Sequence, residues 1–184
     1  GRSLLVALTD EAVDPAVKGA LLAALRVKGE TASELRGMAL AMREAARPLS
    51  VPRDAPLVDT CGTGGDGSHS INISTAASLV VAALGIRVVK HGNRSVSSKS
   101  GSADVLEAMG IALPTDPAEA EARLLSTGWT FLFAPVFHPA MRAVVPVRRA
   151  LGVRTAFNLL GPLTNPACPT HQLLGAFSVD AAFK

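Results

Sequence analysis

The chain has 184 residues, of which 48% are hydrophobic and 18% charged, with a formal net charge of +3. This composition is typical of a globular protein with one good core and room for a small second domain, and it excludes a disordered chain. The 18 basic residues are dispersed among 15 acidic ones, so no nucleic-acid-binding arm stands out, and the mild positive charge suits an anionic metabolite equally well.

The first quarter of the chain has the periodicity of helices. Leu22 and Leu25 belong to one helix, which we expect to end at Gly29, and Thr31 or Ser33 can cap a second. The segment RPLSVPRDAP that follows holds three prolines, which predicts a linker and a domain boundary.

After this linker, short strands alternate with helices. We predict strands at about 57–60, 86–90 and 130–134, helices at about 74–84, 103–109 and 116–126 (with Thr115 or Asp116 as the cap of the last), and a strand-like run at about 171–178. Such alternation predicts crossover units and a mainly parallel sheet, so the fold class is α/β. The longest apolar run is too short to span a bilayer and no signal peptide is visible, so we expect a cytoplasmic protein that makes no membrane contact.

The stretch DTCGTGGDGSHSINIST, residues 59–75, concentrates glycines and hydroxyl groups between a strand and a helix. In a parallel sheet such a loop lies at the carboxyl end of a strand, where ligands bind. Its glycines let backbone amides approach a ligand closely, and Asn72, Ser74 and Thr75 open a helix whose dipole attracts an anion. We therefore predict a phosphate site, with an ordinary tight turn and helix cap as the alternative. The pattern fits neither GxxxxGK[ST] nor GxGxxG, which disfavours a standard nucleotide-binding loop.

A second polar loop, KHGNRSVSSKSGSAD, follows the next predicted strand at the same edge of the sheet. It presents Lys90, Arg94 and Lys99 among serines, and Asn93 can both donate and accept hydrogen bonds. Two adjacent loops of this kind predict a ligand with more than one phosphate. For Arg94 and Lys99 taken singly, a solvated surface loop is the alternative. Asp66 in the first loop does not favour bare phosphate, so we expect it to face a hydroxyl, a metal or a loop amide.

The two cysteines, Cys61 and Cys168, lie far apart and form no CxxC pair. Neither a disulfide framework nor a zinc site is expected from them. With no partner base in view, Cys61 is interpreted as a small buried side chain and not a nucleophile. Trp129 is interpreted as a core residue and not a stacking platform for a substrate.

Four segments, taken together, closely resemble the anthranilate phosphoribosyltransferases: GTGGDGSHSINIST, KHGNRSVSSKSGSADVLEAMG, FLFAPVFHPAMRAVVPVR and LGVRTAFNLLGPLTNP. The resemblance runs from the N-terminal helices to the end of the chain. It implies transfer of the phosphoribosyl group from phosphoribosyl pyrophosphate to the amine of anthranilate in tryptophan biosynthesis, giving N-(5-phosphoribosyl)anthranilate and pyrophosphate. Two alternatives are a pyrimidine nucleoside phosphorylase-like enzyme, which shares the architecture and a Gly-rich loop, and a nucleic-acid-binding homologue, which Asn93, Arg148 and NLLGPL oppose.

The resemblance assigns binding roles residue by residue. For phosphoribosyl pyrophosphate it implies Gly62, Gly65, Asp66, Ser70 (where many members have Thr), Asn72, Ile73, Ser74, Thr75, Lys90, His91, Gly92, Asn93, Arg94, Ser95, Val96, Ser97, Ser98 and Ser102. For anthranilate it implies Gly62, Asn93, His138, Met141 and Arg148, although His138 could instead be a helix-start histidine that makes a local bond. Ser74 matches a contact to Mg²⁺, the implied cofactor. No catalytic side chain is implied, because positioning and electrostatics carry the chemistry.

The family fold implies two domains and a homodimer. A small helical domain comprises residues 1–50, joined by helices of about 138–152, and an α/β domain comprises 56–137 and 153–184. The homodimer contact is implied through the helical domain, and nucleic acid is not expected as a partner. Family members continue well past residue 184 and carry an acidic Asp-Glu pair for Mg²⁺ there, and a last strand would lack its covering helix. We therefore expect a fragment that is incomplete at its C-terminus and a poor catalyst by itself.

Overall fold

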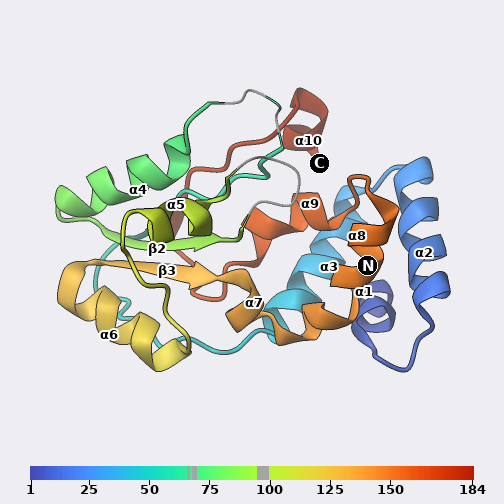
Figure 1. The fold of residues 1–184 in the computed structure, drawn as a ribbon, viewed down its shortest axis with the longest axis horizontal. Helices are drawn as coiled ribbons and strands as arrows, with labels where there is room; N and C mark the ends of the chain where they lie inside the picture. Colours follow the sequence, from blue (N-terminus) through green and yellow to red (C-terminus); the bar gives the residue numbers. More distant parts are fainter. Residues whose placement is uncertain (66, 68–69, 95–99) are drawn as a thin grey trace.

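Figure 1 shows the fold in a computed structural model, which describes residues 1–65, 67, 70–94 and 100–184. A small bundle of helices occupies one end of the molecule, and a parallel sheet covered by helices occupies the other. The predicted combination of a small N-terminal helical domain with an α/β domain is confirmed.

The bundle begins with three helices, namely α1 (Arg2–Thr9), α2 (Pro15–Lys28) and α3 (Ala32–Glu44). The Asp14 side chain caps α2, and Gly29 ends that helix with a positive φ of 83°, a conformation that glycine adopts without strain. Thr31 caps α3 in a capping box with Glu34, which settles the choice between Thr31 and Ser33. Helix α1 lies within residues 1–50, which we predicted to be a helical domain.

Four strands form a fully parallel sheet in the order β3-β2-β1-β4: β1 (Leu57–Asp59), β2 (Arg87–Gly92), β3 (Trp129–Phe133) and β4 (His171–Gln172). Alternate side chains of β2 enter the two faces of this sheet. Val88 packs on one face with α4 (Ile73–Ala83) and α5 (Ser102–Ala108), and Val89 packs on the other with α6 (Pro117–Thr127). The helices therefore cover both faces, as short crossovers between parallel strands require (Figure 1).

The chain returns to the bundle after β3 through α7 (Ala134–Phe137), the 3₁₀ helix η1 (Pro139–Ala143), α8 (Val145–Leu151), α9 (Phe157–Leu160) and the 3₁₀ helix η2 (Gly161–Thr164). Val147 of α8 and Leu160 of α9 join the apolar cluster built on α1, α2 and α3. We had placed the segment that contains α9 in the α/β domain, whereas α9 packs against the bundle. The limits of the two domains stay a prediction.

The predicted strand at about 171–178 is wrong in its length. Strand β4 has two residues, and α10 (Val179–Phe183) follows a segment that leaves the sheet. The backbone of this segment bonds the first polar loop instead, because the Gly175 carbonyl accepts from the Thr63 amide at 2.8 Å. Among the described residues, none of the helices is long and apolar enough to cross a membrane.

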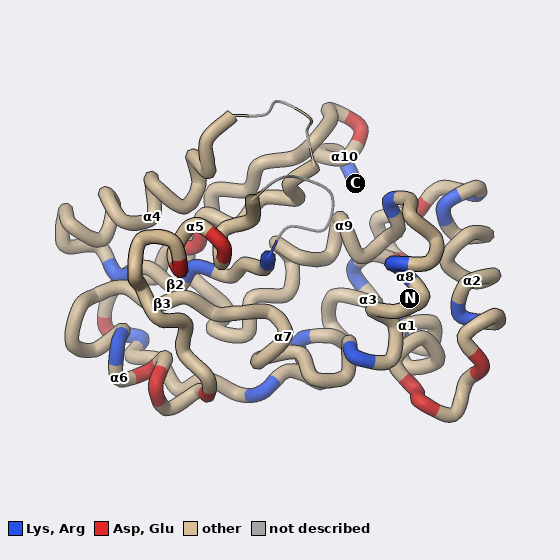
Figure 2. Tube along the Cα trace, in the orientation of Figure 1, with Lys and Arg blue, Asp and Glu red and all other residues tan. Residues whose placement is uncertain are grey.

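Charges of both signs are distributed over the described trace (Figure 2). Lysine and arginine positions occur on the bundle as well as around the sheet, interspersed with aspartate and glutamate. In this part of the chain they form no continuous basic stripe of the kind that follows a nucleic-acid backbone.

Candidate functional site

The two polar loops leave the sheet side by side, because β1 and β2 are parallel neighbours. Lys90, near the end of β2, connects them. Its side chain is only 2% exposed, and its Nζ atom lies 3.4 Å from Thr60 Oγ1 and 3.3 Å from Ser74 Oγ. Burial lowers the pKa of Lys90, and the negative charge of Asp59 acts in the opposite direction. A buried cation next to a helix N-terminus can hold a phosphate group.

A buried carboxylate fixes the ends of the same two strands. Asp59 accepts hydrogen bonds from the backbone amides of Cys61, at 2.9 Å, and His91, at 3.2 Å. The Asn165 side chain donates to Asp59 at 2.9 Å and to the Val89 carbonyl at 2.8 Å. Burial raises the pKa of Asp59, and the Asn165 hydrogen bond and the Lys90 charge oppose that rise. Our sequence interpretation assigned no role to Asp59 or Asn165, although a carboxylate at a strand end was a usable signal.

Close backbone contacts hold the start of the first loop. A Cβ atom on Gly62 would lie 2.9 Å from the Gly175 carbonyl oxygen, so this position requires glycine. The Thr63 hydroxyl accepts from the Phe177 amide at 3.0 Å. The expectation that Cys61 is a buried small side chain is confirmed, and burial raises the pKa of its thiol to about 12, which disfavours a nucleophile.

Arg154 also contacts the glycine turn. Its guanidinium donates to the Gly65 carbonyl and lies 4.2 Å from the centre of the Phe177 ring. Gly65 has a positive φ of 69°, so its backbone conformation favours glycine. Arg154 was missed by the sequence interpretation because its partner lies 89 positions away along the chain.

The start of α4 presents fewer side chains than the resemblance implies. Asn72 is the N-cap residue, but its side chain does not cap the helix and donates to the Gly101 carbonyl at 3.2 Å. Ser74 and Ile73 are exposed, whereas Thr75 is buried and its hydroxyl has no partner among the described residues. Ser74 and the backbone amides of the helix are therefore the groups available to an anion here.

The described part of the second loop consists of its two ends. The Asn93 side chain accepts from the Arg94 amide at 2.8 Å, and the Ser102 hydroxyl donates to the Asn93 carbonyl at 3.2 Å. Gly92 lies so close to Ser102 that a Cβ atom would be 2.4 Å from its hydroxyl oxygen. Ser70 is exposed and its hydroxyl donates to the Ile71 carbonyl. Five predicted site residues lie outside the described residues: Asp66, Ser95, Val96, Ser97 and Ser98.

Two histidines meet where the sheet joins the bundle. The rings of His91 and His138 are edge to face, with centres 5.2 Å apart, and His91 Nδ1 bonds the Gly161 carbonyl at 3.0 Å. Burial lowers the pKa of His91 to about 3 and that of His138 to about 4. His138 is the N-cap residue of η1, and its carbonyl accepts from the Met141 amide at 3.0 Å. Its buried ring lies near the backbone of Met42 and Thr164. Both interpretations of His138, as part of an anthranilate site and as a helix-start histidine, stay predictions.

The residues that resemble an anthranilate site come from both parts of the molecule. Arg148 is half-buried on α8 and its guanidinium lies 5.2 Å from the centre of the Phe157 ring, whereas Arg149 is exposed. Burial lowers the pKa of Arg148. Met141 packs against the apolar cluster of the bundle, and its amide donates to the His138 carbonyl. Trp129 lies in the core, as expected, and donates to the Ser78 hydroxyl at 3.1 Å.

A magnesium ion would find one protein ligand in the described part of this site. Within that part, no group of three or more His, Cys, Asp or Glu side chains could hold a metal. Ser74 supplies a single hydroxyl oxygen, and it lies 3.3 Å from the Lys90 ammonium. Mg²⁺ commonly binds through one or two protein ligands plus substrate phosphates. Ser74 therefore fits Mg²⁺ only together with oxygens of a phosphorylated ligand.

A helical bundle joined to a parallel sheet, with a buried lysine between two polar loops, defines a class of α/β protein that can hold a phosphorylated ligand. Residues 54–184 match the domain family described as "Glycosyl transferase family, a/b domain". Residues 2–46 match "Glycosyl transferase family, helical bundle domain". The chain belongs to this glycosyl transferase family.

The similar proteins are anthranilate phosphoribosyltransferases. The enzyme of Synechococcus sp. (strain JA-3-3Ab) is 59% identical over 169 residues, which are 91% of this chain and 49% of that enzyme. The crystal structure of the Thermus thermophilus enzyme has a TM-score of 0.90 at 54% identity and covers 97% of this chain and 54% of its own. The Saccharomyces cerevisiae structure in complex with PRPP and Mg has a TM-score of 0.86 at 29% identity, over 98% and 53% of the two chains. The chain spans about half the length of the curated relatives it matches.

Proposed function

We propose that the chain binds phosphoribosyl pyrophosphate together with Mg²⁺ and takes part in transferring the phosphoribosyl group to the amine of anthranilate. The observation that carries this proposal is the buried Lys90 ammonium, which lies between Thr60 and Ser74 at the ends of neighbouring strands. The relatives' shared name supplies the two substrates, and the yeast complex supplies the metal.

In the proposed reaction, the amine nitrogen forms a bond to C1 of the ribose while the bond from C1 to pyrophosphate breaks. The electron pair of that bond leaves with pyrophosphate, and the amine then loses a proton. Lys90, Ser74 and the first amides of α4 hold the phosphate oxygens, and Arg148 suits the carboxylate of anthranilate. Mg²⁺, when bound, neutralises charge on pyrophosphate. Positioning and neutralisation lower the barrier without a strong base.

Calorimetric titration of the chain with phosphoribosyl pyrophosphate in the presence of Mg²⁺ tests this proposal. We expect saturable binding of one ligand per chain, and much weaker binding of ribose 5-phosphate, which lacks the pyrophosphate. Absence of binding, or phosphorolysis of thymidine or uridine by the same preparation, would count against the proposal.

Arg148 provides a prediction for the second substrate. Replacing Arg148 with alanine should weaken anthranilate binding by roughly 10- to 100-fold, because it removes a half-buried guanidinium that can bond a carboxylate at about 1.5–3 kcal/mol. Arg149→Ala is the matched control, since Arg149 is its exposed neighbour on the same helix. Anthranilate affinity is measured by calorimetry with phosphoribosyl pyrophosphate present. A larger effect at Arg149 would show that the wrong arginine has been chosen.

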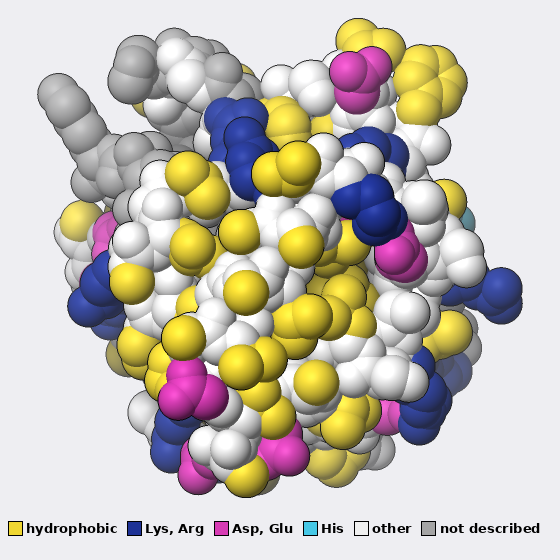
Figure 3. Space-filling view, turned by 90° about the vertical axis from the view of Figure 1, so that its right-hand side faces the viewer, with side chains coloured by type: hydrophobic (Ala, Val, Ile, Leu, Met, Phe, Trp, Pro, Cys, Tyr) yellow, Lys and Arg dark blue, Asp and Glu magenta, His cyan; other side chains and the backbone are white. Residues whose placement is uncertain are grey.

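We also propose that two chains associate through the helical bundle. The face of the molecule at the bundle end carries apolar side chains across its middle (Figure 3). The bundle helices α1 and α2 bear exposed valines, since Val6 is 58% exposed and Val17 is 50% exposed. Burying such a patch stabilises a dimer. Val17→Asp should therefore shift sedimentation velocity from dimer towards monomer. Val80→Asp is the control on α4, where Val80 is 59% exposed; equal effects of the two substitutions would contradict this interface.

A further inference from the structure

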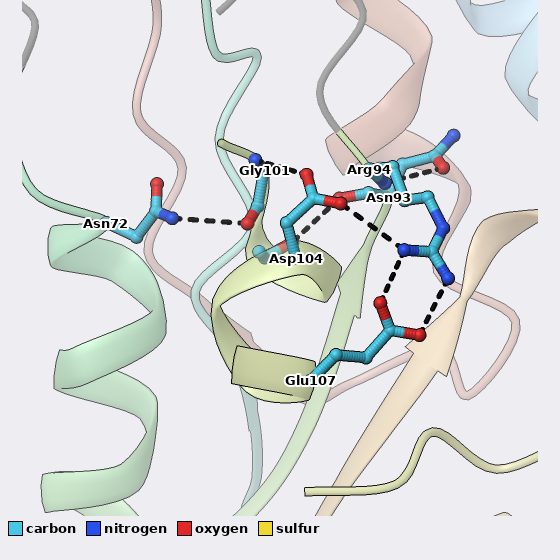
Figure 4. Close-up of polar contacts among 7 residues, drawn as sticks. Asn72, Asn93, Arg94, Gly101, Asp104 and Glu107 are labelled. Carbon is cyan, nitrogen blue, oxygen red and sulfur yellow. Dashed lines mark hydrogen bonds and ion pairs between the residues drawn. The ribbon is translucent and has the colours of Figure 1, made fainter. Parts of the chain in front are cut away.

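Arg94 lies just beyond β2, and two carboxylates of α5 engage its guanidinium. Both terminal nitrogens bond the Glu107 carboxylate, one of them at 2.6 Å, and Nη1 also bonds Asp104 at 3.3 Å (Figure 4). The guanidinium lies 5.5 Å from the centre of the Phe133 ring. An arginine held by two carboxylates and an aromatic ring is fixed in position.

The guanidinium of Arg94 is already engaged by two carboxylates, those of Asp104 and Glu107. These ion pairs leave less of its charge available to a phosphate. Lys90, in contrast, bonds two hydroxyl oxygens, and the nearby buried Asp59 acts on it through its charge without an ion pair among the described residues. The two basic residues at the described end of β2 therefore differ in what they can offer to an anion, although the family resemblance assigns them the same role.

One of these carboxylates, that of Asp104, also holds the far end of the second loop. Asp104 accepts from the Gly101 amide at 2.7 Å and so caps α5. On the near side, the Asn93 carbonyl accepts from the Ser102 hydroxyl and the Ala103 amide. The strand end and the helix start on either side of this loop are thus bonded to each other directly.

One further hydrogen bond connects this cluster to the first loop. Asn72, at the start of α4, donates its side-chain amide to the Gly101 carbonyl at 3.2 Å (Figure 4). A continuous series of contacts therefore runs from Asn72 through Gly101 and Asp104 to Arg94 and Glu107. Helices α4 and α5 pack on the same face of the sheet, so the series joins the beginnings of two neighbouring helices at the edge where both loops lie.

We propose that Arg94 is a positioning residue and not a phosphate ligand. Its ion pairs with Glu107 and Asp104 hold the ends of the second loop against α5 and, through Gly101 and Asn72, fix them relative to the start of α4. The phosphate-binding groups on β2 and α4, Lys90 and Ser74, are thereby kept at the spacing that one ligand requires. This inference rests on the proposed function, because it specifies how that site is held in shape.

Replacing Glu107 with alanine distinguishes a phosphate ligand from a positioning residue, because the two roles of Arg94 predict opposite changes in the affinity for phosphoribosyl pyrophosphate. If Arg94 were a phosphate ligand, Glu107→Ala would release its guanidinium and remove a negative charge, and binding of phosphoribosyl pyrophosphate with Mg²⁺ would strengthen. If Arg94 is a positioning residue, Glu107→Ala and Arg94→Ala should each weaken binding by about two- to fivefold, the effect expected from losing solvent-exposed ion pairs that act on the site indirectly. Glu119→Ala is the control, since it deletes a partly buried ion pair with Arg123 on α6, together with the Glu119 bonds to Thr115.

Two further readouts separate positioning from general loss of structure. The exchange Arg94→Glu with Glu107→Arg, made together with Asp104→Asn because Asp104 also faces position 94, restores a cation–carboxylate pair and should recover most of the lost affinity, which a phosphate ligand could not do. Increasing salt should weaken binding as steeply in Arg94→Ala as in the unsubstituted chain, but less steeply in Lys90→Met, which loses a charge that faces the ligand.

The binding measurements separate the proposed function of the chain from the proposed positioning role of Arg94. Failure of the unsubstituted chain to bind phosphoribosyl pyrophosphate overturns the proposed function itself. Binding by the unsubstituted chain, combined with unchanged or tighter binding by Glu107→Ala, overturns the positioning role alone. The positioning role is also overturned if the exchanged pair does not regain affinity although the variant unfolds at the same temperature as the unsubstituted chain.

Discussion

Lys90→Met should weaken the binding of phosphoribosyl pyrophosphate by about 100-fold, because truncating a buried charge that bonds a ligand costs about 2–5 kcal/mol. Methionine retains the length of the apolar stem, so the substitution removes mainly the ammonium. Within the described residues, Lys90 is the cation that approaches both Thr60 and Ser74. Its burial excludes water that would otherwise replace the lost interaction.

Lys18→Met is a closely matched control for this experiment. Lys18 is also 2% exposed, but it lies on α2 in the bundle, where Nζ is 3.4 Å from the Ala143 carbonyl. Calorimetry should give an affinity for Lys18→Met that equals that of the unsubstituted chain. An equal loss in both variants would mean that removing any buried lysine disturbs the fold, and Lys90 would lose its assignment as a phosphate ligand.

Local signals predicted much of this fold from the sequence. Thr31 and Asp116 each stand three residues before a glutamate, and both cap helices in the structure. Gly29 ends α2 with a positive φ, and the alternation of strands with helices predicted the parallel sheet. Each of these features depends on residues a few positions apart, where the side-chain chemistry of a short segment decides the outcome.

The contacts that shape the candidate site were not predictable in this way. Asp59 meets Asn165 across 106 positions, and Arg154 meets Gly65 across 89. The sequence shows that these side chains can bond, but it does not show which partner each will find. The length that we predicted for the last strand was also wrong. Gly175 bonds Thr63 in the first loop and not a neighbouring strand, and the sequence does not show this distant contact.

Arg94 shows the limit of assigning roles from a motif. Its position in KHGNR, just after β2, predicts a cation near phosphate. Only the return of α5 against the strand end shows that Glu107, 13 positions later, occupies its guanidinium. Composition of a loop thus predicts which charges are present, whereas tertiary packing decides which of them remain available to a ligand.

The histidine pair should make the chain lose stability in mildly acidic solution. Burial lowers the pKa of His138 to about 4 and that of His91 to about 3, whereas both are near 6.5 in an unfolded chain. The unfolded state therefore binds protons that the folded state excludes. The resulting stabilisation is complete above about pH 6.5 and is lost as the pH falls towards these lowered values.

The expected loss between about pH 7 and pH 5 is roughly 2 kcal/mol for each of the two histidines. Urea unfolding at the two pH values measures it, and His138→Gln should lose roughly 2 kcal/mol less over this interval than the unsubstituted chain. Trp129→Phe is the control for a buried side chain that does not titrate: it should lower the free energy of unfolding equally at both values, through loss of the bond to Ser78. If His138→Gln kept the whole pH dependence, His138 would accept a proton in the folded chain, and its ring could not lie neutral and buried against His91 as the structure places it.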